Sequence, residues 1–329
     1  MSSEMETESL NDYNWDDIES IPIKEEASSA LCRIMYSEEY KQQLGYLRAL
    51  LTKQEYSARA LLLTDSIIDA VPAHYTAWNY RYNIVKNIDR DLERELVWCQ
   101  EVAYDKPKNY QIWHYRSLII ELVESRGGSV DISNETTISD DMLEEDSKNY
   151  HVWAYRKWLV RRYQLFRDNI EDLTTKKMIA LDVRNNSAWS HRFFVMLGDF
   201  GETRPETASE TVEQEIGFAK IMINQCPENP SAWSYLQGIY KLAKKDLLAE
   251  KEFCELYAVG AGKSDQRSVE SRFSLPATEL LARIYEVSQD NSKASSLYSI
   301  LGSKYDPMRR NYWEMKRQRL DSANSATVS

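Results

Sequence analysis

The sequence is poor in residues that interrupt helices. Its 329 residues include only 10 glycines and 8 prolines, whereas strand-rich proteins need frequent turns and usually contain more of both. The sequence has no apolar run of about 18 residues, the length that would span a membrane. Its start also lacks the basic and apolar regions of a secretory signal. We therefore expect a helical, soluble, cytoplasmic protein without stable membrane insertion.

Paired cysteines and an excess of positive charge are also missing. The four cysteines are Cys32, Cys99, Cys226 and Cys254. They lie far apart without a CxxC pair, so neither a disulfide framework nor a zinc site is expected in this chain. The net charge is −11, and residues 1–30 alone contribute −8. The remainder is nearly neutral and offers no basic surface to nucleic acid or to an anionic membrane.

Aromatic residues are abundant, with 9 tryptophans and 21 tyrosines, and many belong to one repeated motif. In this motif a tryptophan is followed three residues later by arginine. The copies contain Trp78 with Arg81, Trp113 with Arg116, Trp153 with Arg156, Trp189 with Arg192, and Trp233, which has Leu236 in place of arginine. Successive tryptophans are 35, 40, 36 and 44 residues apart. This period fits two helices with their turns and indicates stacked helical hairpins.

Both ends of the chain extend the series of hairpins. A first hairpin at about 38–70 lacks the motif but keeps helical apolar spacing. Degenerate copies follow near the C-terminus, at Leu280 with Arg283 and at Trp313 with Lys316. We predict an all-α fold, a right-handed α–α superhelical solenoid of about seven hairpins over residues 31–320.

Three segments are expected to lie outside the helices. Residues 1–30 are acidic and low in apolar content, which predicts a flexible segment. Residues 125–133 contain two glycines and predict a surface loop, which accounts for the 40-residue spacing between Trp113 and Trp153. Residues 321–329 are small and polar and predict a disordered tail.

The motif also predicts local contacts. Asn109, Asn149 and Ser187 are expected to be N-caps, because a short polar side chain can accept a bond from a free helical N–H. Tyrosine, tryptophan and arginine at positions i, i+3 and i+6 are expected on one wide helical face. We interpret the tryptophan as a wedge between hairpins and the arginine as a donor to carbonyls or carboxylates of the next hairpin. Both columns would then be structural.

Two copies carry a lysine directly before the tryptophan helix, at Lys108 and Lys148. A helix N-terminus has about half a positive charge and free N–H donors. Tyr110 and Tyr150 each add a hydroxyl, so the two copies could hold a phosphate or diphosphate. The alternative is that these lysines are simply solvated. Sequence motifs of common cofactor sites are absent, and the histidines show no metal-ligand spacing.

Three copies carry a family resemblance. The segments PKNYQIWHYR at 107–116, SKNYHVWAYR at 147–156 and DVRNNSAWSHRFFV at 182–195 resemble three successive repeats of the protein prenyltransferase α subunit. The resemblance spans about 12–320 and is nearer to the α subunit shared by farnesyltransferase and type I geranylgeranyltransferase than to that of the Rab enzyme. It implies a crescent of seven hairpins wrapped around an α/α-barrel β subunit.

The resemblance also implies a reaction and its residues. The heterodimer would move a farnesyl or geranylgeranyl group from its diphosphate to the cysteine of a C-terminal CaaX sequence. Zn²⁺ would be held by the β subunit, with no metal in this chain, and Mg²⁺ would assist the farnesyl enzyme. The implied residues are Lys108, Tyr110 and Tyr150 for catalysis, Lys148, Asn149 and His151 on the diphosphate side, and Gln111 and Tyr75 for the peptide. Lys108 would neutralise charge on the departing diphosphate.

Two other functions stay open at this stage. One is the α subunit of Rab geranylgeranyltransferase, which needs an escort protein. The other is a non-catalytic scaffold of the tetratricopeptide kind, although its period of about 34 residues with small-residue columns fits poorly. Lys108 and Gln111 within a single copy favour the CaaX enzyme.

Overall fold

The computed structural model describes residues 9–22, 34–198, 208–259 and 274–327, with side chains up to residue 320. Within these ranges all regular elements are helical, which confirms the predicted fold class. No helix in the described ranges is long and apolar enough to cross a membrane. The chain divides into two compact units, 1–158 and 159–329, and the boundary falls inside α7.

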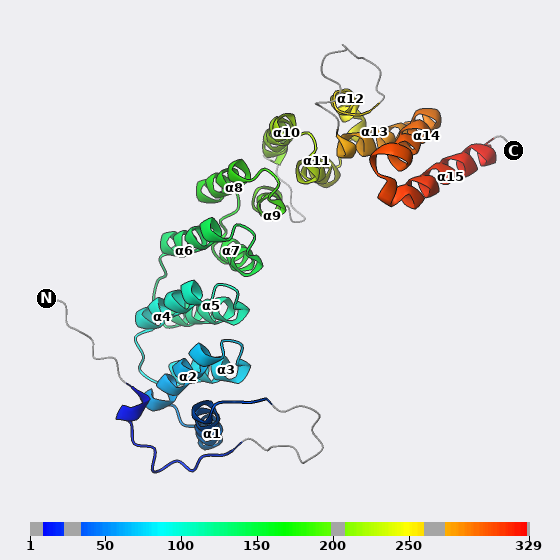
Figure 1. The fold of residues 1–329 in the computed structure, drawn as a ribbon. Helices are drawn as coiled ribbons and strands as arrows, with labels where there is room; N and C mark the ends of the chain where they lie inside the picture. The colour runs from blue at the N-terminus through cyan, green and yellow to red at the C-terminus, as the bar shows by residue number, and fades with distance from the viewer. Residues whose placement is uncertain (1–8, 23–33, 199–207, 260–273, 328–329) are drawn as a thin grey trace. The chain divides into compact units, whose positions relative to one another are not determined.

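The helices pair in sequence order (Figure 1). The first unit contains α1 Glu38–Lys53, α2 Ala58–Ala70, α3 Tyr75–Asn87, α4 Leu92–Asp105, α5 Tyr110–Ser125, α6 Ile132–Glu145 and the start of α7 Tyr150–Tyr163. The second unit contains α8 Asn169–Leu181, α9 Asn186–Leu197, α10 Ala208–Gln225, α11 Pro230–Ala243, α12 Lys251–Glu255, α13 Leu275–Val287, α14 Asn291–Ile300 and α15 Arg310–Thr327. Each unit is therefore a series of antiparallel hairpins, as in an α–α solenoid.

The tryptophan helix is the second member of each hairpin. Helix α2 packs on α3, α4 on α5, α8 on α9, and α10 on α11. The predicted hairpin at 38–70 matches α1 and α2, which also pack together. The regular repeat nevertheless begins at α2, so α1 precedes the first repeat and is not its first half.

The tryptophan rings lie between hairpins, as predicted. Trp113 on α5 contacts Tyr155 on α7 with ring centroids 5.0 Å apart, and Trp189 on α9 contacts Tyr235 on α11 at 5.1 Å. Both tryptophans are buried, at 4% and 2% exposure. Each ring thereby fills the space between two successive tryptophan helices.

The arginines bond carboxylates of the next hairpin, as predicted, and they also donate to acceptors within their own hairpin. Arg116 on α5 donates to Glu135 on α6 at 2.6 and 2.8 Å, and to the Leu96 carbonyl of its own hairpin at 2.7 Å. In the second unit Arg192 bonds Glu215 on α10 at 2.7 and 2.9 Å. These side chains are almost fully buried, so each charge is compensated where water cannot reach it.

The predicted common face for tyrosine, tryptophan and arginine is wrong for the tyrosine. Tyr110 and Tyr150 are 57% and 77% exposed, whereas Trp113 and Arg116 are buried. The tyrosines are the first residues of α5 and α7. The buried aromatic ring of each copy instead comes two residues after the tryptophan, as in Tyr155.

Asparagines cap the tryptophan helices. Asn109 and Asn149 accept bonds from N–H groups of the first helical turn, as predicted. The prediction for Ser187 is wrong, because Asn185 caps α9 and Ser187 is one of its donors. The same caps bind the preceding repeat: Asn149 Nδ2 donates to the Pro107 carbonyl at 2.9 Å. Neighbouring loops are thus joined.

Three predicted segments differ in extent. Helix α5 ends at Ser125 and α6 starts at Ile132, so the predicted loop at 125–133 is limited to 126–131, with Gly127 at φ 81°. Helix α15 continues to Thr327, into the predicted tail at 321–329. Residues 328–329, like 1–8 and 23–30 of the predicted N-terminal segment, lie outside the described residues.

The C-terminal copies follow the motif only in part. Leu280 is buried, but Arg283 is exposed and donates to Gln237, so the predicted arginine role is wrong there. Trp313 is fully buried and Lys316 bonds Glu286 at 3.1 Å, which keeps a cation–carboxylate contact at the expected position.

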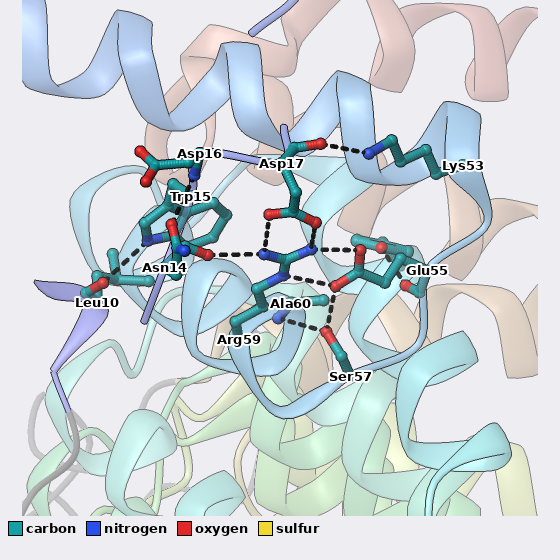
Figure 2. Close-up of polar contacts among 11 residues, drawn as sticks. Leu10, Asn14, Trp15, Asp16, Asp17, Lys53, Glu55, Ser57, Arg59 and Ala60 are labelled. Atoms are coloured by element: carbon teal, nitrogen blue, oxygen red, sulfur yellow. Dashed lines mark hydrogen bonds and ion pairs between the residues drawn. The ribbon is translucent and has the colours of Figure 1, made fainter. Parts of the chain in front are cut away.

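Residues 9–22 are packed against α1 and α2, and we call them the N-terminal strap (Figure 2). Trp15 stacks on Tyr46 of α1 with ring centroids 4.5 Å apart, and Ile18 is buried. Arg59 of α2 donates to both carboxylate oxygens of Asp17 at 2.7 and 2.8 Å. The prediction of a flexible segment therefore does not describe this part of residues 1–30.

Candidate functional site

The candidate site lies in the first unit, where α5 and α7 begin. Residues 106–109 and 146–149 form the loops before these helices, and each loop ends in a capping asparagine. The cap and the helix direction place the free N–H groups of the first turn toward the loop. Each loop also carries an exposed lysine, Lys108 and Lys148.

The exposed tyrosines of the two helices are connected through one histidine. The rings of Tyr110 and His151 lie 6.2 Å apart, and those of Tyr150 and His151 lie 5.6 Å apart with an edge-to-face arrangement. The structure therefore brings together three of the predicted site residues from two adjacent repeats. Their polar atoms are available at the surface, because both tyrosines are more than half exposed.

Lys108 has a partner that the sequence analysis did not identify. Its ammonium group bonds Oδ2 of Asp146, which lies in the equivalent loop of the next repeat. The other oxygen of Asp146 accepts the backbone N–H of Lys148 at 3.2 Å. The bond from Lys108 lowers the pKa of the Asp146 carboxyl, so this group is ionised at neutral pH.

Gln111 occupies an unusual position for an amide side chain. It is only 5% exposed, and neither its Oε1 nor its Nε2 has a hydrogen-bond partner among the described residues. Leaving such a group unpaired costs about 1–3 kcal/mol. The indole N–H of Trp113, two residues along α5, also lacks a described partner. The start of α5 therefore contains one buried acceptor, Gln111 Oε1, and two buried donor groups, Gln111 Nε2 and Trp113 Nε1, without a described partner.

The remaining predicted site residues separate into two groups. Asn149 is 1% exposed, and both ends of its amide are engaged by the His151 N–H and the Pro107 carbonyl. Its position is that of a structural cap and not of a ligand-facing group. Tyr75, at the start of α3, is 71% exposed and lies one hairpin before α5.

Cations, phenols and helix N-termini gathered on one edge can stabilise an anion. Lys108 supplies an exposed positive charge, while Tyr110 and Tyr150 supply hydroxyl donors. No group of three or more His, Cys, Asp or Glu side chains capable of holding a metal occurs among the described residues.

A further set of residues was missed, although the sequence contained a signal for it. Glu95, Glu135, Glu171 and Glu215 are buried acceptors for the arginines or for the aromatic residue after each tryptophan. Each one precedes the tryptophan of its own repeat by 18 residues. The column is structural, and two of its members contact the helices of the candidate site: Glu95 accepts a bond from Tyr115 of α5 and Glu135 from Tyr155 of α7.

Comparison with known proteins identifies the family to which the chain belongs. The family model for the protein prenyltransferase alpha subunit repeat matches residues 57–88, 92–123, 132–163, 171–198 and 212–243. A protein farnesyltransferase/geranylgeranyltransferase type-1 subunit alpha from Candida albicans is 42% identical over 312 residues, covering 94% of this chain and 98% of the relative. The chain belongs to the protein prenyltransferase α-subunit family.

More distant relatives and a solved structure agree with this assignment. The corresponding subunit of Dictyostelium discoideum is 31% identical over 314 residues, covering 92% of this chain and 91% of its own. The structure of Candida albicans protein geranylgeranyltransferase-I complexed with GGPP has a TM-score of 0.84 and 39% identity. The match covers 94% of this chain and 99% of that one. The prenyltransferase repeats begin with the first helix of each observed hairpin, so the family unit and the structural unit coincide.

Proposed function

We propose that this chain is the α subunit of a heterodimeric CaaX prenyltransferase. It would act with a β subunit of the farnesyltransferase or type I geranylgeranyltransferase kind, transferring an isoprenyl group from farnesyl or geranylgeranyl diphosphate to a C-terminal CaaX cysteine. The observation that supports this most is that the start of α5 brings together the cation of Lys108, in the preceding loop, and the buried unpaired amide of Gln111. The Lys108 ammonium group suits a diphosphate, and the Gln111 amide suits a peptide carboxylate.

Lys108 is proposed to act on the leaving group. As the bond between the isoprenyl C1 and the diphosphate oxygen breaks, negative charge accumulates on that oxygen. A preplaced ammonium stabilises this charge more in the transition state than in the ground state. Tyr110 and Tyr150 would donate hydrogen bonds to the same diphosphate, with Lys148 and His151 beside them.

Gln111 is proposed to recognise the peptide. Its Nε2 can donate to the terminal carboxylate of the CaaX sequence, which would satisfy an amide that is otherwise unpaired and buried. Tyr75 would lie nearer the end of the same peptide. Zinc is proposed to be held by the β subunit, where it would activate the substrate thiol, and magnesium would assist when the lipid is farnesyl diphosphate.

Replacement of Lys108 tests the proposal. Purified heterodimer containing Lys108→Ala should assemble normally but perform the transfer step roughly 10²-fold more slowly in single-turnover measurements, the scale for loss of one transition-state donor. Lys106→Ala removes a cation two residues earlier that already pairs with Asp105 and Asp69, and it should transfer at the normal rate. Normal transfer by Lys108→Ala would refute the role, and absence of transferase activity with either type of β subunit would refute the function.

A further inference from the structure

The contact between Lys108 and Asp146 joins two neighbouring loops at the position where a diphosphate would bind. The ammonium group that would meet the diphosphate already has an anionic partner in this chain. Lys108 is 72% exposed and Asp146 is 35% exposed, so the pair lies at the surface beside the tyrosines of α5 and α7. Any anion that binds Lys108 must either share the ammonium group with Asp146 or displace the Asp146 carboxylate from it.

Asp146 is held in place by its own loop. It is the C-cap of α6, and its Oδ1 accepts the Lys148 N–H, which leaves Oδ2 directed to Lys108. A second bond between the same two loops runs from Asn149 Nδ2 to the Pro107 carbonyl, directly beside Lys108. The carboxylate is therefore fixed, whereas the lysine side chain is long and mobile.

This difference determines which partner moves. A lysine side chain has four rotatable methylene groups, so its ammonium can swing from Asp146 to an anion at the mouth of α5 and return. An exposed ion pair is worth about 0.2–1 kcal/mol, which is weak enough to exchange. The carboxylate cannot follow the ammonium, because its loop is bonded on both sides.

We propose that Asp146 is a positioning residue that competes with diphosphate for Lys108. Before substrate binds, it holds the ammonium at the edge of the site. After transfer, the Asp146 carboxylate pairs with the ammonium group again, and this lowers the affinity of the site for the released inorganic pyrophosphate. This inference rests on the proposed function, and it adds a counter-ion that governs product release.

The aspartate of this contact recurs in the next loop of the same kind. Asp182 occupies the equivalent place before α9, and its carboxylate also accepts a loop N–H, from Arg184 at 2.9 Å. The residue that corresponds to Asp146 in the loop before α5 is Lys106. The aspartate is thus part of the loop's turn in two repeats, and Asp146 also binds the candidate catalytic lysine.

The test is made on the heterodimer with inorganic pyrophosphate as the probe. Asp146→Asn keeps an oxygen for the Lys148 N–H but removes the charge. Its inhibition constant for pyrophosphate should fall about two- to fivefold, a change that corresponds to an exposed ion pair of up to about 1 kcal/mol. The gain should shrink when ionic strength rises to about 1 M, where charges are screened within about 3 Å.

Two controls make the result specific. Glu145→Gln removes the same charge from the neighbouring, exposed residue at the end of α6, and it should leave the inhibition constant unchanged. In a Lys108→Ala background, Asp146→Asn should also have no effect, because the competition needs the ammonium. A merely structural role for Asp146 would not depend on Lys108 or on salt.

Each outcome separates this inference from the proposed function. Equal pyrophosphate inhibition for wild type, Asp146→Asn and Glu145→Gln would overturn the competition while leaving the transferase assignment intact. Tighter pyrophosphate binding that persists without Lys108 would overturn it as well, because the effect would then be simple repulsion. Normal transfer by Lys108→Ala would remove the proposed role of Lys108, whereas absence of transfer with either type of β subunit would remove the proposed function itself.

Discussion

At the scale of single residues, buried carboxylates connect neighbouring hairpins. Glu135 is 2% exposed and accepts two bonds from Arg116 of the preceding hairpin and one from Tyr155 of its own, at 2.6, 2.8 and 2.7 Å. A buried ion pair contributes little by comparison with apolar packing, but removing one partner leaves an uncompensated charge. The contact therefore selects one alignment of neighbouring hairpins.

Replacing Glu135 tests this role directly. Glu135→Ala should reduce the free energy of unfolding by about 3–5 kcal/mol, because the Arg116 guanidinium would be buried without a counter-charge. Chemical denaturation of the isolated chain provides the measurement. Glu145→Ala, at an exposed position on the same helix, should change stability by less than about 0.5 kcal/mol. Similar values for both variants would show that the buried pair does not hold the hairpins.

Acid should weaken the contacts between the arginines and the buried glutamates, and Glu95 shows the expected direction. Burial raises the pKa of Glu95, but charge interactions and hydrogen bonds from Arg81 and a bond from Tyr115 outweigh burial, and the net pKa lies below its ordinary value of 4.5. Stability from this group is therefore complete above about pH 4.5 and is lost as pH falls through the lowered pKa. Denaturation midpoints measured from pH 7 to pH 3 should decline, and Glu95→Gln should decline less steeply from a lower starting value.

At the scale of the elements, the tryptophan helices join consecutive hairpins. Trp113 of α5 is 4% exposed and lies against Tyr155 of α7, with ring centroids 5.0 Å apart. Large apolar side chains at such positions supply most of the packing energy between repeats. Because each repeat contacts only its neighbours, a cavity at one tryptophan should act locally.

The Trp113→Ala variant should open a cavity costing about 3–5 kcal/mol. Trp153→Ala, at the equivalent position of α7, should cost a similar amount. The adjacent exposed residue supplies the control, and His114→Ala should unfold like wild type within about 0.5 kcal/mol. Unfolding midpoints in denaturant compare the three variants, and wild-type behaviour of both tryptophan variants would remove the wedge interpretation.

The elements also show what the sequence could and could not predict. The tryptophan and arginine columns were predictable because their spacing repeats, and the glutamate column, 18 residues before each tryptophan, carried an equally regular signal. The pairing of Lys108 with Asp146 was not predictable, since it depends on how two loops 38 residues apart face each other. The exposure of Tyr110 was missed because helical periodicity alone does not show which residues of a first turn a neighbouring helix covers.

On the scale of the whole molecule, the end of a repeat series needs a cover. Terminal repeats lack a neighbour on one side, so their apolar face would otherwise meet water. In the first unit this cover consists of α1 and the N-terminal strap, in which Ile18 is buried and Trp15 stacks on Tyr46. Gly45 of α1 permits the close approach, because a Cβ there would meet Ser20 Oγ at 2.0 Å.

Arg59 is the main polar attachment of the strap. It bonds both oxygens of Asp17, the Asn14 carbonyl and Glu55, all at 2.7 or 2.8 Å. The bond from Arg59 lowers the pKa of Asp17 to about 2, so this attachment is fully charged above about pH 4 and is lost only as pH falls through about 2. Ordinary changes in pH therefore do not release the strap.

Removing the arginine should release it. In Arg59→Ala, backbone amides of the strap should exchange hydrogen faster than in wild type, while those of α4 and α5 keep their protection, because opening is local. Arg48→Ala, which removes one bond to the Ile21 carbonyl, should raise exchange only near Ile21. Unchanged exchange in Arg59→Ala would mean that the remaining contacts, among them those of Trp15 and Ile18, suffice to hold the strap. Loss of protection throughout the first unit would mean that the strap is part of its cooperative core.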